Sequence, residues 1–115
     1  MIDLEVNVIN SNPDPGSVRG TPGYLAPEIL VGLHSGDVRS DLYSLGALLY
    51  ELVSLNKPVT GSSAQEIFEN TKKHNIQPLS SKTPLAIKHI IMKALSLDSS
   101  KRYNCVMDLI AEVTN

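Results

Sequence analysis

The 115-residue sequence predicts a mainly helical protein, with one short N-terminal strand followed by about five helices. Apolar residues alternate with polar ones only near the N-terminus, and this period of two is typical of a strand. Further along, apolar residues recur at helical spacing between turn-forming residues. Apolar residues make up 42% of the chain and charged residues 19%, so the composition is that of a folded protein.

The N-terminal quarter contains the predicted strand and two irregular segments. Residues 2–8 alternate as a half-buried strand does, and residues 10–17 are turn formers and small polar residues that predict an exposed loop. Two prolines and two glycines in residues 20–27 exclude regular structure there. A short helical turn is expected at residues 28–31, closed by Gly32.

The central segment, residues 42–53, predicts a helix that is apolar on every face. Nine of its twelve residues are apolar or tyrosine. Ser40 or Asp41 is the expected N-cap. A helix that is apolar all round is normally buried, and it needs more neighbours than an amphipathic helix does.

Three further helices are predicted after residue 60. Ser63 and Glu66 have the spacing of a capping box, and Thr83-Pro84 opens the next helix with proline in its first turn. That helix carries a regular apolar stripe: Ile87, Ile90, Ile91, Ala94 and Leu95. The last helix places four apolar residues on one face: Val106, Leu109, Ile110 and Val113.

Composition excludes several classes of function. Ten basic and twelve acidic residues give a net charge of -2, so we expect no binding to nucleic acid or to an anionic membrane surface. The nearly apolar run at 42–53 is shorter than the ~20 residues that span a bilayer. The N-terminus lacks the basic region of a signal peptide, and the lone Cys105 fits a reducing compartment, so a cytoplasmic location is expected. The three histidines and this cysteine lack zinc-site spacing.

Three motifs occur in a fixed order: GTPGYLAPE at residues 20–28, SDLYSLG at 40–46 and DSSKR at 98–102. Together they resemble the large lobe of a serine/threonine protein kinase from the end of its activation segment onward. The resemblance covers about residues 3–113. It implies a kinase-like C-lobe, truncated, with residues 1–115 forming a partial kinase domain. Residues 1–27 would be an activation-segment-like strand and loop, and residues 28–115 a helical C-lobe subdomain.

The resemblance assigns structural roles to three charged residues. The Glu28 carboxylate would pair with the Arg102 guanidinium, whose planar fork can hold a carboxylate with two hydrogen bonds. This pair would tie the activation segment to the rest of the lobe. Asp41 would accept backbone N–H bonds from the catalytic loop of an intact kinase, and it can also serve as an ordinary helix cap.

The resemblance also implies a role in substrate binding for five residues of the activation segment: Thr21, Pro22, Gly23, Tyr24 and Leu25. Thr21 resembles the threonine that contacts the catalytic aspartate and lysine in serine/threonine kinases, and without that aspartate it would be a turn residue. Pro22 to Leu25 would shape the pocket for the residue after the phosphoacceptor.

Two more residues have alternative interpretations upstream of this segment. Ser17 occupies the position of an activating phosphate in such kinases, or is a solvated loop serine. Asp3 resembles a metal-binding aspartate, although Glu5 stands where glycine is expected, and the alternative is a polar residue on an edge strand.

Several parts that phosphoryl transfer requires have no match in the sequence. These are the Gly-rich loop, the strand lysine, its partner glutamate, and the catalytic-loop aspartate and asparagine. We therefore assign no catalytic residue and expect the chain to be inactive alone and to need no cofactor, while ATP and magnesium are implied for an intact kinase.

Two functions follow from this reading. The chain is the C-terminal lobe portion of a serine/threonine kinase, or a non-catalytic, pseudokinase-like module that binds proteins. The expected partners are a protein substrate or the missing N-terminal kinase half. In a kinase, a further helix and the catalytic loop surround the helix at 42–53, so we also expect an exposed apolar patch and self-association.

Overall fold

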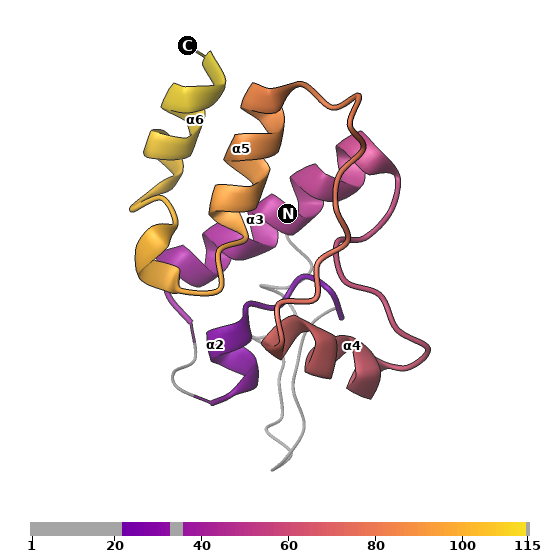
Figure 1. Cartoon of the computed structure of the whole chain (residues 1–115). Helices are drawn as coiled ribbons and strands as arrows, with labels where there is room; N and C mark the ends of the chain where they lie inside the picture. The colour runs from indigo at the N-terminus through magenta and orange to yellow at the C-terminus, as the bar shows by residue number, and fades with distance from the viewer. Residues whose placement is uncertain (1–21, 33–35, 115) are drawn as a thin grey trace.

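The computed structural model describes residues 22–32 and 36–114. The regular elements in this part of the chain are helices (Figure 1). The mainly helical class predicted from the sequence is confirmed. The predicted strand at 2–8 lies outside the described residues, and the described part contains no strand. The elements are α2 (Pro27–Leu30), α3 (Val38–Ser54), α4 (Ala64–Lys72), α5 (Leu85–Ala94), the 3-10 turn η1 (Ser99–Lys101) and α6 (Val106–Thr114).

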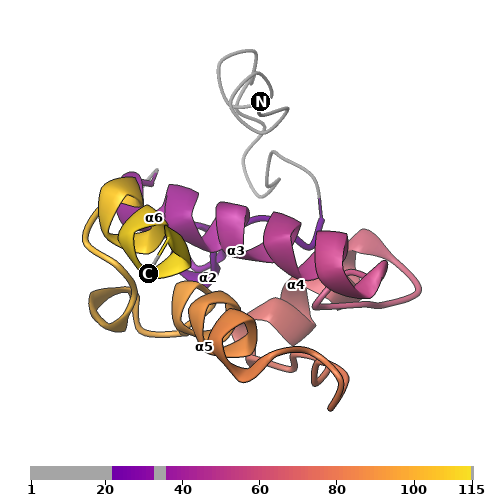
Figure 2. The same ribbon diagram turned by 90° about the horizontal axis from the view of Figure 1, so that it is seen from above.

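The long helix α3 organises the fold. It packs most extensively against α5, while α6 lies beside α5 at one end of α3 (Figures 1 and 2). The crossing of α3 and α5 is close because Gly46 has no side chain. A Cβ at Gly46 would lie 2.7 Å from the Cβ of Ala94, a separation that real side chains do not tolerate.

The core consists of two apolar clusters, and both include residues of α3. Both clusters include residues of α5, and the predicted stripe of that helix faces them. The first cluster contains Ala26, Tyr43, Ala47, Tyr50, Leu79, Ile91 and Leu95. The second contains Leu42, Ile90, Ala94, Tyr103 and Leu109.

The helix starts differ in detail from the prediction. Asp37 caps α3, because its extended backbone lets its carboxylate accept the N–H groups of Arg39 and Ser40. The expected cap at Ser40 or Asp41 was therefore wrong. The Ser63 hydroxyl caps α4 by accepting the N–H of Glu66, as predicted.

Two further details at the helix starts are specific to the structure. The Glu66 carboxylate accepts the N–H of Ser62, not that of the cap residue Ser63. Helix α5 begins at Leu85, with Pro84 at the cap position itself and not in the first turn.

Two predicted apolar surfaces are not buried. Helix α3 is buried on the side that faces α5, but Leu52 near its end is 66% exposed. On α6 only Leu109 is buried, while Val106, Ile110 and Val113 are exposed. Helical spacing identified these faces correctly, but no described element covers them. Within residues 22–32 and 36–114, no helix has the length and apolar character needed to cross a bilayer.

Candidate functional site

A buried ion pair joins Glu28 of α2 to Arg102, which follows η1. Arg102 Nη1 lies 2.7 Å from Glu28 Oε2, and Nη2 lies 2.9 Å from Oε1, so the contact is bidentate. The two residues are 7% and 3% exposed, respectively. They are 74 positions apart in the chain, so the pair ties the start of the described chain to its C-terminal part.

Further hydrogen bonds hold both members of the pair. The Ser40 hydroxyl donates to Glu28 Oε2 at 2.7 Å. Arg102 Nε donates to the Ser96 carbonyl at 2.8 Å, and its Nη1 donates to the Arg39 carbonyl at 3.0 Å. The pairing of both charged groups matters because a buried charge without its partner destabilises the fold by ~3–5 kcal/mol.

The electrostatics of Glu28 keep it ionised. Burial by itself raises the pKa of the Glu28 carboxyl, but the hydrogen bonds from Arg102 and Ser40 outweigh burial and lower that pKa below its usual value. The Arg102 guanidinium also lies over the ring of Tyr43, 5.1 Å from the ring centroid. The ion pair therefore has a structural role, and its contacts favour the ionised form of the Glu28 carboxylate.

The segment that precedes α2 is anchored in the helical core. Leu25 is buried, and Ala26, which caps α2, belongs to the first core cluster. Gly23 has φ +95°, a conformation that side-chain-bearing residues rarely adopt. Pro22 is half-buried. Residues 22–25 therefore form a fixed turn on the surface of the helical core.

Tyr24 is held at three points. Its carbonyl accepts a 2.6 Å hydrogen bond from the Ser44 hydroxyl, and its phenol donates to the Glu51 carboxylate. The Lys57 amine lies 5.3 Å from its ring centroid. Burial, followed by the Glu51 hydrogen bond and charge, raises the pKa of Tyr24 to about 12. The phenol therefore stays neutral and its ring orientation is fixed.

The structure describes only part of the predicted site. Thr21, Ser17 and Asp3 lie outside the described residues. Asp41 lies in the first turn of α3 and is exposed, and its backbone N–H donates to the Asp37 carbonyl at 3.1 Å.

Sequence reasoning missed three residues of the site. Ser40 was treated only as a cap, and Glu51 and Lys57 were given no role. One signal was available, because Glu51 is the one charged residue in the apolar run at 42–53. A carboxylate at such a position needs a partner, and Tyr24 provides it.

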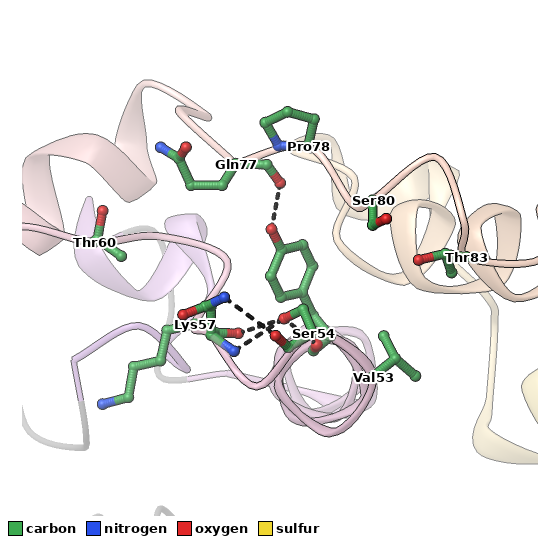
Figure 3. A pocket seen from close by; sticks show the side chains of 10 residues that line it. Val53, Ser54, Lys57, Thr60, Gln77, Pro78, Ser80 and Thr83 are labelled. Atoms are coloured by element: carbon green, nitrogen blue, oxygen red, sulfur yellow. Dashed lines mark hydrogen bonds between the residues drawn. The ribbon is translucent and has the colours of Figure 1, made fainter.

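A pocket of about 580 Å³ lies beside the C-terminal end of α3 (Figure 3). The Tyr50 phenol donates to the Gln77 carbonyl at 2.6 Å, and the Ser54 hydroxyl is hydrogen-bonded to the main chain of Tyr50 and Asn56. Figure 3 shows Lys57 extending away from Pro78. The residues that line the pocket include no carboxylate, imidazole or thiol, and their titratable groups are the Lys57 amine and the Tyr50 phenol.

Comparison with known proteins identifies the class of protein. The family model "Protein kinase domain" matches residues 3–112. The chain belongs to the protein kinase family.

Individual relatives are serine/threonine kinases by name. The chain is 45% identical over 83 residues to the probable serine/threonine-protein kinase pkgA of Dictyostelium discoideum, covering 72% of this chain and 6% of that protein. It is 33% identical over 107 residues to the serine/threonine-protein kinase PknB of Mycobacterium tuberculosis, covering 90% and 17%. The serine/threonine-protein kinase PknD of Chlamydia abortus is 29% identical over 121 residues, covering 98% and 13%. The chain thus spans less than a fifth of the length of these relatives.

The described residues contain no group of three or more histidine, cysteine, aspartate or glutamate side chains able to hold a metal ion. Glu28, the buried carboxylate, has both oxygens committed to Arg102. The arrangement can hold a surface turn in place.

Proposed function

We propose that this chain is the substrate-side, C-terminal part of the large lobe of a serine/threonine protein kinase. The whole enzyme would transfer a phosphoryl group from ATP, with magnesium, to a protein hydroxyl. The observation that carries the proposal is the buried Glu28–Arg102 pair, because it fixes the turn at residues 22–25 against the helical core. That turn, with Thr21 before it, would contact the protein substrate near its phosphoacceptor. Residues 1–27 would be the activation-segment part and residues 28–115 the helical part of this lobe, in the cytoplasm.

The chain alone would not catalyse phosphoryl transfer. The sequence lacks the Gly-rich loop and the strand lysine that hold ATP, as well as the catalytic-loop aspartate and asparagine. Incubation of the purified chain with magnesium, labelled ATP and a generic protein substrate such as casein should give no labelling above background. Labelling that survives extensive purification would refute this part of the proposal.

A second candidate function is that of a non-catalytic module that binds another protein. The exposed apolar residues of α6 favour it, because large exposed apolar patches usually mark interaction surfaces. In this case the chain would keep the fold of the kinase lobe but would have no part in catalysis.

The intact mass of the native polypeptide in its source cells distinguishes the two functions. A mass well above 12.5 kDa would support a kinase whose nucleotide-binding part belongs to the same polypeptide. A mass near 12.5 kDa would favour the binding module and count against the kinase proposal. The measurement is mass spectrometry of the protein immunoprecipitated under denaturing conditions.

A further inference from the structure

Lys57 brings an amine to the turn at residues 22–25 from a distant part of the chain. Its Nζ lies 5.3 Å from the centroid of the Tyr24 ring, and a Cβ built at Gly23 would lie 3.5 Å from Lys57 Cδ. The side chain therefore lies against two of the four residues of the turn. Figure 3 shows it extending away from Pro78, which lines the same pocket.

The backbone that carries Lys57 is held by its neighbours. Leu55 ends α3 in the left-handed conformation, and Pro58 and Val59 are buried. The N–H of Gln77 donates to the Pro58 carbonyl at 2.9 Å. Lys57 itself is half-buried, as is usual for a lysine whose methylene groups lie against other residues while its amine reaches water. The fold therefore restricts where this amine can lie.

The Lys57 amine keeps its hydrogen-bond donors for a ligand. It forms no hydrogen bond or ion pair with any of the described residues, and the ion pairs in this part of the chain involve other side chains. Contact with the face of a tyrosine ring leaves the donors of an ammonium group open to another partner. Glu51 also lies at the turn, but its carboxylate accepts the hydrogen bond of the Tyr24 phenol.

We propose that Lys57 is a substrate-specificity residue, and that the protein segment bound at the turn carries the carboxylate of an aspartate or glutamate close to its phosphoacceptor. This inference rests on the proposed function, in which the turn contacts the substrate near that hydroxyl. A lysine ammonium is a compact charge that attracts a carboxylate. It would also repel a basic side chain that approached Glu51, so an acidic segment is favoured over a basic one.

Three synthetic peptides test this specificity on the complete chain. Each contains one serine in a background of alanine and glycine, with glutamate, glutamine or lysine on both sides of the serine. NMR titrations of the ¹⁵N-labelled chain follow the amide signals of Gly23, Tyr24 and Leu25. The glutamate peptide should bind roughly fivefold more tightly than the glutamine peptide, the factor given by one pair of opposite charges ~4 Å apart in water. Added salt should reduce this preference.

Matched substitutions identify the amine responsible. Lys57→Gln should remove the preference for glutamate, because glutamine has no charge, whereas Lys57→Arg should keep it. Lys93→Gln is the control, because Lys93 Nζ also lies over a tyrosine, 4.5 Å from the ring centroid of Tyr103 in the second core cluster. This control should leave the preference unchanged. All three variants should keep the circular dichroism of the parent chain, and the Lys57→Arg result separates a lost charge from a disturbed fold.

Each remaining outcome decides the inference. Equal binding of the glutamate and glutamine peptides to the parent chain overturns it and leaves the proposed function standing. Tighter binding of the lysine peptide also overturns it, because Glu51 would then select the substrate. A preference for glutamate that persists in Lys57→Gln belongs to another residue and overturns it as well. If none of the three peptides shifts the signals of the turn, the proposed function fails, and the inference fails with it.

Discussion

Replacing Glu28 by glutamine should strongly destabilise the fold. The substitution keeps the size of the side chain but removes the charge that faces Arg102, which is 3% exposed and has no other carboxylate bonded to it among the described residues. Removing one partner of a buried ion pair costs ~3–5 kcal/mol. This is a large fraction of the ~5–15 kcal/mol that stabilises a typical domain.

The size of the thermal shift follows from the chain length. An unfolding entropy of ~2.1 cal/mol/K per residue gives ~0.24 kcal/mol/K for a chain of this length, or ~4 °C for each kcal/mol. The Glu28→Gln variant should therefore unfold ~12–20 °C below the parent protein, as measured by circular dichroism at 222 nm and neutral pH.

A matched control is available on α4. Glu69 Oε2 lies 2.7 Å from Lys72 Nζ, the same separation as in the buried pair, but the two side chains are 42% and 34% exposed, respectively. Glu69→Gln should leave the unfolding temperature almost unchanged, because water and salt screen exposed pairs. Equal shifts for Glu28→Gln and Glu69→Gln would refute the reasoning.

The pH dependence of the effect has a definite sign. The pKa of Glu28 is lower in the folded protein than its usual value, so the folded state favours the ionised carboxylate. The contribution of Glu28 to the free energy of unfolding is therefore complete above the unfolded-state pKa, and it is lost as pH falls through the folded-state pKa. The difference in unfolding temperature between the parent protein and Glu28→Gln should be largest near neutral pH and should become smaller in acid. A difference that stays constant down to pH 2 would contradict this assignment.

Three further substitutions test the packing, each by urea unfolding. Tyr43→Phe should be neutral or stabilising by ~1 kcal/mol, because the buried Tyr43 hydroxyl has no hydrogen-bond partner in the described part of the chain; a clear loss of stability would reveal a missed partner. Gly46→Ala should destabilise by ~1–3 kcal/mol by forcing α3 away from Ala94, and an unchanged midpoint would mean the crossing can widen freely. Leu55→Gly should stabilise by ~1 kcal/mol, because Leu55 ends α3 with φ +63° and is 85% exposed; destabilisation would disprove backbone strain there.

The parts of the fold that sequence predicted correctly are those with a local signal. The stripe on α5 repeats at helical spacing, and Ile90, Ile91, Ala94 and Leu95 of that stripe are buried. The Ser63 cap of α4 is local as well. The contact between Glu28 and Arg102 is not local, and it was predicted from the family resemblance of the motifs that contain the two residues.

The features that were missed depend on neighbours. The residues Asp37, Ser40 and Asp41 are all good caps, and which one serves depends on the backbone before α3. Spacing placed Val106, Ile110 and Val113 on one face of α6, but spacing cannot show whether another element covers that face. The Tyr24–Glu51 contact joins residues 27 apart and has no periodic signature.

The separation of Glu28 and Arg102 along the chain also affects folding kinetics. Closing a loop of 74 residues costs on the order of ~4 kcal/mol of entropy, so the pair is expected to form after α3 and α5 have packed and brought its two ends together. An interaction that is absent from the transition state contributes to the unfolding barrier and not to the folding rate. The packing of α3 on α5 would then set how fast the protein folds, while this ion pair would set how long the folded state lasts.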